Sequence, residues 1–163
     1  MLESLNDFLS PWASYYGDHT WLSNAVTFLH LAALLWGGGR AVTADLVTLR
    51  SRGFDEFQSA GHLKFLKASH RDVLIGLTVA TVSGLLMFTS DFDHFLKAPV
   101  YWAKITAVVV LLGNGIFLKR AEAGLELGGS TGFAAFGMAK RHAAVSLFLW
   151  FATTLLGQMA TTA

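Results

Sequence analysis

The stretch Trp21-Leu-Ser-Asn-Ala-Val-Thr-Phe-Leu-His30-Leu-Ala-Ala-Leu-Leu-Trp36-Gly-Gly-Gly39 decides the fold of this chain. It contains no Asp, Glu, Lys or Arg, and roughly 20 predominantly apolar residues suffice to cross a bilayer as a helix. His30 stands near its middle, and an ionisable side chain at that depth usually faces a bundle interior or a cofactor because lipid penalises it. The stretch therefore predicts a membrane-spanning helix that carries one candidate for a function.

Three further stretches without charged residues follow, at residues 73–90, 105–118 and 143–163. Of the 163 residues, 53% are hydrophobic and only 14% are charged, whereas soluble domains carry about a quarter charged residues. We therefore expect one domain over residues 1–163, an all-α integral membrane four-helix bundle. The predicted spans are about 19–49, 58–89, 98–124 and 135–161, and the glycine-rich segment 124–132 connects the last two, with a turn at Gly128-Gly129-Ser130.

The arm that precedes the first span, residues 1–18, is acidic and contains no Lys or Arg, unlike a cleaved signal peptide. Its apolar residues recur at helical spacing, and Ser10-Pro11 is typical of an N-cap followed by proline at the first helical position. These features predict a short helix that lies on the membrane interface. A flexible tail is the alternative.

Lys and Arg are concentrated in the segments 40–71 and 119–141, whereas the arm has none and the segment 90–98 has only Lys97. Loops rich in Lys and Arg stay in the cytoplasm. We therefore expect a multi-pass protein of the bacterial inner membrane with both termini on the non-cytoplasmic side. The absence of cysteine excludes disulfides and thiolate metal sites, and the net charge of +1 gives no indication of nucleic-acid binding.

The helical face that carries His30 is otherwise made of small residues, namely Ser23, Thr27, Ala33, Gly37 and Ala41. Small residues let helices approach closely in lipid, and they also leave room for a flat macrocycle beside the imidazole. One interpretation is therefore a cofactor ligand, and the other is a structural histidine bonded to a neighbouring helix.

Other polar residues in or beside the spans have two interpretations each. Lys104 enters the third span and either extends its amine to the interface or acts as a metal ligand or as a cation beside a propionate. His70, Arg71, Arg141 and His142 lie near the cytoplasmic ends, where they are ordinary interfacial residues or contacts of a haem, His70 being an alternative iron ligand.

Four short motifs occur in order along the chain. They are His30 with Trp36-Gly-Gly-Gly39, His70-Arg71 with Ser83 to Phe88, Tyr101-Trp-Ala-Lys104, and Arg141-His-Ala-Ala with Ser-Leu-Phe-Leu-Trp150. This order resembles the four-helix bacterial membrane proteins that include the HemJ-type protoporphyrinogen oxidases and the membrane domain of CopD-type copper-resistance proteins. The resemblance implies a b-type haem held by a histidine of the first helix and a lysine of the third, which correspond here to His30 and Lys104.

We therefore expect a haem b membrane protein with a redox role, either an electron-transfer subunit or a haem-dependent oxidoreductase. The lipid bilayer, a quinol or porphyrin ligand, and a larger membrane complex or a homo-oligomer are the expected partners, without nucleic acid. A cofactor-free accessory subunit is the alternative, and copper handling is a second one that the CopD-type resemblance suggests.

Overall fold

The computed structural model describes residues 2–160, and in this part of the chain every regular element is helical. The elements in chain order are α1 (Leu2–Asp18), α2 (Thr20–Ala33), the π-helix η1 (Leu34–Gly38), α3 (Gly39–Arg50), α4 (Phe54–Ser59), α5 (His62–Ser90), α6 (Phe92–Lys97), α7 (Pro99–Leu127) and α8 (Gly129–Ala160). Four helical stretches are long and apolar enough to cross a membrane, namely Thr20–Arg50, His62–Ser90, Pro99–Leu127 and Gly129–Ala160. The predicted all-α four-helix bundle is confirmed.

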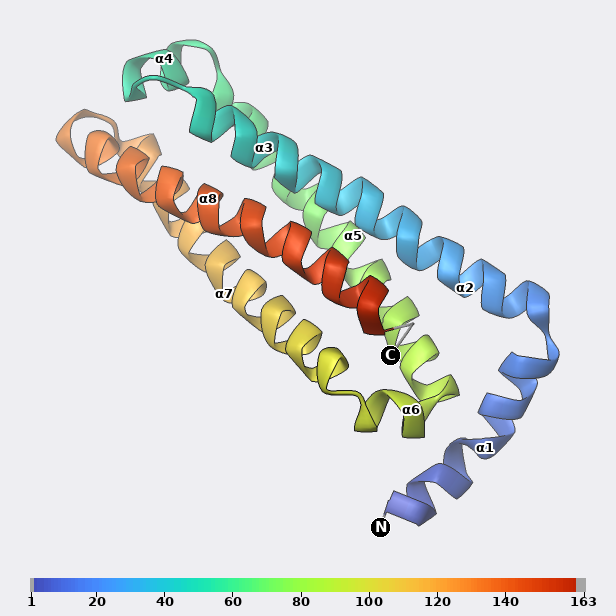
Figure 1. Ribbon diagram of the computed structural model, residues 1–163. Helices are drawn as coiled ribbons and strands as arrows, with labels where there is room; N and C mark the ends of the chain where they lie inside the picture. The colour runs from blue at the N-terminus through green and yellow to red at the C-terminus, as the bar shows by residue number, and fades with distance from the viewer. Residues whose placement is uncertain (1, 161–163) are drawn as a thin grey trace.

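The continuous helix made of α2, η1 and α3 packs against α5 along one side and against α8 along the other, and α8 packs against α7 (Figure 1). In contrast, α5 and α7 contact each other little, so the bundle is open along this edge. The short helix α4 lies at one end of the bundle, whereas α1 and α6 lie at the other (Figure 1). We refer to these as the α4 end and the α1 end.

The N-terminal arm is helical, but the predicted helix start at Ser10-Pro11 is wrong. Helix α1 begins at Leu2 and continues through Pro11. Proline has no N–H to donate to the carbonyl four residues earlier. The Ser10 hydroxyl instead donates to that carbonyl, the one of Asp7, at 2.9 Å. The helix therefore continues without leaving the Asp7 carbonyl unpaired. The arm then reaches the bundle, where Trp12 Nε1 donates to the carbonyl of Leu86 at 3.4 Å.

The boundaries of three spans differ from the predicted ones. The second span begins at His62 rather than near residue 58, because Gly61 adopts a left-handed conformation, with φ of 70°, and separates α4 from α5. The glycine-rich segment 124–132 contains a turn of only two residues, Gly128 and Gly129, which have φ of 67° and 53°. The rest of that segment is helical, so the third span is longer than predicted, and the fourth begins at Gly129.

The first and second spans approach each other most closely at Gly37 and Gly76. A Cβ added to Gly76 would stand 2.6 Å from Gly37 Cα and 2.8 Å from the carbonyl oxygen of Ala33. The next glycine, Gly38, faces a different neighbour, because its own Cβ would stand 3.1 Å from the Trp150 ring of α8. The π-helix therefore turns two consecutive glycines toward two different helices.

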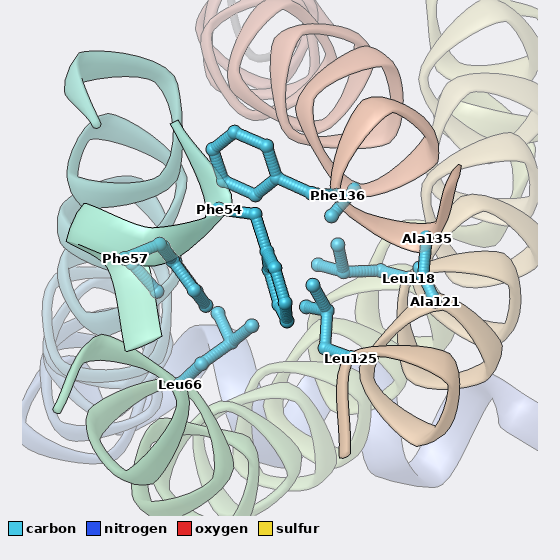
Figure 2. Packing of buried hydrophobic residues seen from close by; sticks show 10 residues of the cluster. Phe54, Phe57, Leu66, Leu118, Ala121, Leu125, Ala135 and Phe136 are labelled. Atoms are coloured by element: carbon cyan, nitrogen blue, oxygen red, sulfur yellow. The ribbon is translucent and has the colours of Figure 1, made fainter. Parts of the chain in front are cut away.

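An aromatic core closes the α4 end of the bundle. Phe54 and Phe57 of α4 point inward between the spans, where they are 3% and 1% exposed (Figure 2). The ring of Phe57 lies 5.4 Å from that of Phe136. The Phe54 ring occupies the space where Gly132 would carry a Cβ. The core is completed by Ala44, Leu66, Leu118, Ala121, Leu125, Ala135 and Ala139.

Candidate functional site

His30 of α2 is half-buried and lies against α5. Its Nδ1 lies 3.0 Å from the Ser83 hydroxyl oxygen. The single hydroxyl proton of Ser83 is directed to the carbonyl of Val79 at 2.7 Å, with that of Ala80 at 3.2 Å. Because a serine hydroxyl has a single proton, this geometry favours the tautomer in which Nδ1 of His30 donates to Ser83 and Nε2 carries the lone pair.

Gly84 lies against the face of this imidazole. A Cβ added to Gly84 would stand 3.2 Å from His30 Cε1. A histidine that donates from one ring nitrogen to a fixed acceptor and offers the other is typical of metal ligands, since the outer hydrogen bond sets both tautomer and ring orientation. Such a histidine is also a suitable acceptor for a buried hydroxyl. The arrangement supplies an oriented nitrogen lone pair.

Lys104 of α7 lies close enough to His30 for its charge to act on the imidazole. Its aliphatic end and amine pack beside Gly157 of α8, both 3.5 Å from where a Cβ of that glycine would stand. Among residues 5–160, no ion pair or hydrogen bond is formed by its Nζ. The two residues singled out in the first and third spans thus lie in the same half of the bundle, nearer α1, and no carboxylate of the described residues pairs with Lys104.

The small-residue face beside His30 serves helix packing over part of its length. Ala33, Gly37 and Ala41 are buried, whereas Thr27 is exposed and Ser23 is half-buried. Gly37 is covered by the backbone of α5 at Gly76. Any space for a macrocycle therefore lies above this crossing, at the level of His30 and Lys104, and not along the whole face.

His70 and Arg71 are not brought to His30. On α5, Ser83 is the residue that lies beside His30. Twelve residues of helix separate Ser83 from Arg71 and thirteen separate it from His70, which corresponds to about 18–20 Å at 1.5 Å per residue. His70 is half-buried and its Nδ1 lies 3.2 Å from Glu122 Oε1 of α7. Arg71 is exposed. His70 is therefore too distant to be a second ligand of a metal bound at His30.

His142 and Arg141 of α8 are also separated from Lys104, because His142 contacts Asn114, which lies ten residues, or about 15 Å, along α7 from Lys104. The Nδ1 of His142 lies 2.7 Å from Asn114 Oδ1, and Asn114 Nδ2 donates to the carbonyl of His142 at 2.9 Å. The imidazole also stacks on Phe117 at 5.3 Å, and Arg141 is exposed. These contacts give His142 a structural role between α7 and α8, which the sequence had left as one of two interpretations.

Sequence reasoning missed two buried carboxylates, Asp45 and Glu122, which are 1% and 4% exposed. Neither lies in a charge-free stretch, so a search for such stretches passes over both. The available signal was the spacing of Ala41, Asp45 and Thr48, which places the aspartate on the buried face of α3. Asp45 lines a cavity of about 400 Å³ that also contains Ser69, His70, Lys119, Ser146 and Trp150.

The fold and hydropathy define the chain as a polytopic helical membrane protein. Comparison with protein-family models, curated proteins and solved structures finds no match. The resemblance to the HemJ and CopD types stays a prediction.

Proposed function

We propose that this protein binds a b-type haem through His30 and Lys104 and transfers electrons within the bacterial inner membrane. The observation that carries the proposal is the pair itself: an imidazole hydrogen-bonded to Ser83 and an amine of another helix whose charge acts on that imidazole. Two nitrogen donors inside a helical bundle are suited to a metal cofactor, since bundles build such sites from facing helices.

The neighbours of both donors support the same proposal. Gly84 and Gly157 border the imidazole and the amine; a Cβ at Gly84 would stand only 3.2 Å from the imidazole, whereas one at Gly157 would be in ordinary contact with the amine. The π-helix η1 begins four residues after His30, and single π-turns within α-helices are frequent at functional sites. A bound haem would supply one-electron redox chemistry, while the protein would set its potential through ligand identity, hydrogen bonding and burial.

The first test is the dithionite-reduced minus oxidised visible spectrum of the detergent-purified protein, expressed with ample haem supply, together with iron and copper analysis. We expect a b-type α-band that His30→Ala abolishes and that His94→Ala leaves unchanged, because His94 is exposed on α6. Ser83→Ala should keep the haem and shift its midpoint potential, since it removes only the acceptor of the Nδ1 proton.

Other results would favour the other candidates. A featureless spectrum would exclude the haem proposal and direct attention to a cofactor-free subunit, to be identified by what co-purifies with it. Copper without iron would favour the CopD-type alternative. An equal loss of the band in His30→Ala and His94→Ala would show that the spectrum reports general unfolding rather than ligation.

The proposed orientation places the α4 end in the cytoplasm and both chain termini outside it. The chain has no cysteine, so single cysteines can report the side on which they lie. A membrane-impermeant maleimide added to intact spheroplasts should label Lys97→Cys, which is exposed on α6, and not Ser59→Cys, which is exposed at the end of α4. Labelling of Ser59→Cys alone would contradict this orientation and show that the α4 end lies outside the cytoplasm.

A further inference from the structure

The cavity beside Asp45 lies between α3, α5, α7 and α8, in the half of the bundle nearer α4. Its volume is about 400 Å³, within the range of small-molecule sites. The cavity lies at a different depth in the bundle from His30 and Lys104. Nothing in the haem proposal uses its residues, so its buried polar groups need their own explanation.

Asp45 is one of the residues that line the cavity. Its side chain is 1% exposed, and its Oδ2 has no hydrogen-bond partner among the described residues. Ser146 of α8 is the side chain that interacts with this carboxylate. A buried polar atom without a partner costs about 1–3 kcal/mol. The cavity therefore offers a strong acceptor that a ligand with a hydroxyl donor would satisfy.

A second acceptor comes from α5. The Nδ1 of His70 is turned toward Glu122 Oε1 at 3.2 Å, and a carboxylate beside Nδ1 favours the tautomer with its proton there. Nε2 of His70 is then left as an acceptor for the cavity. The lining contains one carboxylate, Asp45, and one amine, Lys119, so it offers no net positive charge to an anionic ligand.

The cavity continues as an open, mainly apolar groove toward the middle of the bundle. A second cavity of about 330 Å³ shares Leu74, Leu77 and Leu112 with the first and extends to Thr81 and Val82. Both lie along the edge where α5 and α7 contact each other little. This edge would face lipid, so a long apolar tail can enter sideways from the bilayer.

We infer that this cavity binds a membrane-soluble hydroquinone, with its two ring hydroxyls donating to Asp45 and His70 and its tail lying between α5 and α7. A hydroquinone has donors on opposite sides of one ring, matching acceptors on two walls. The oxidised quinone has only acceptors and fits less well. The hydroquinone would be the electron donor of the proposed redox role, and to that extent the inference rests on the proposed function. Binding of the hydroquinone itself does not require haem.

The first experiment measures binding of a short-tailed ubiquinol, kept reduced under anaerobic conditions, by isothermal titration calorimetry and by the change in tryptophan fluorescence, to which Trp150 of the cavity lining contributes. The decisive variant is Gly115→Leu, because Gly115 lines the cavity and an added Cβ meets nothing within 4 Å. The matched control is Gly113→Leu, on the same helix and equally free of clashes, but outside the cavity. We expect Gly115→Leu to abolish binding and Gly113→Leu to leave it unchanged.

The second experiment tests the acceptors. Asp45→Asn should weaken binding about tenfold, as expected for loss of a hydrogen bond to a charged group, and Asp72→Asn should not, because Asp72 pairs with Arg40 outside the cavity. The 1,4-dimethyl ether of the same quinol keeps its shape but has no donors, and it should bind at least tenfold more weakly.

Three results would overturn the inference: equal binding of the quinol and its dimethyl ether, tighter binding of the lipophilic cation tetraphenylphosphonium, or binding that survives Gly115→Leu. If Asp45→Asn does not fold, the comparison of Gly115→Leu with Gly113→Leu and the binding of the dimethyl ether still test the inference. Because binding is measured whether or not the preparation contains haem, a protein that binds quinol without haem would contradict the haem proposal alone.

Discussion

Gly76→Ala is expected to lower the free energy of unfolding by about 1–3 kcal/mol, the usual cost of overpacking a well-packed core. The added methyl group would stand 2.6 Å from Gly37 Cα and 2.8 Å from the Ala33 carbonyl oxygen. Both obstacles are backbone atoms, which cannot rotate away as a side chain can. The two spans would have to move apart. The loss of stability is measured by titrating the protein with SDS while circular dichroism monitors its unfolding.

The control for this prediction is Gly113→Ala, since a Cβ there meets nothing within 4 Å. It should be neutral or slightly stabilising, because alanine has the higher helix propensity. Equal effects of the two substitutions would show that the close approach of the first two spans is not what makes Gly76 sensitive. The same displacement would also disturb the contact between His30 and Ser83, which joins the same two helices.

Phe54→Ala should be more costly still, about 3–5 kcal/mol, as for other large aromatic residues removed from a core. The ring is 3% exposed and packs on Gly132, Phe133 and Phe136. Its loss would leave a cavity that Gly132 cannot fill. The control is Phe8→Ala, since Phe8 is 79% exposed on α1. Thermal unfolding should distinguish the two, and a similar change in both would contradict the assignment of Phe54 to the core.

The sequence predicted the spans well because the signal is local. A helix in lipid must satisfy its backbone hydrogen bonds internally and carry a long apolar run, and both properties are visible without knowing the neighbours. The boundaries were less predictable. The start of the second span depends on the left-handed Gly61, and the tight turn at Gly128 and Gly129 replaced a longer predicted loop.

The candidate site was only partly predictable. The approach of Lys104 to His30 was consistent with their depth in the spans, but the role of Ser83 was not visible because it depends on which face of α5 meets α2. Asp45 and Glu122 escaped attention for a related reason. Their burial comes from helices that extend beyond the apolar stretches and continue to pack there, which a search for charge-free runs cannot reveal.

The π-helix at Leu34–Gly38 has a consequence for how the first span is compared with other sequences. A turn that bonds each residue to the fifth along holds about one residue more than an α-helical turn, and one residue corresponds to a rotation of about 100°. The part of the span that carries His30 and the part that carries Asp45 are therefore out of phase in a simple helical wheel. A homologue with an uninterrupted α-helix here would align with both parts only if a gap of one residue were placed between them.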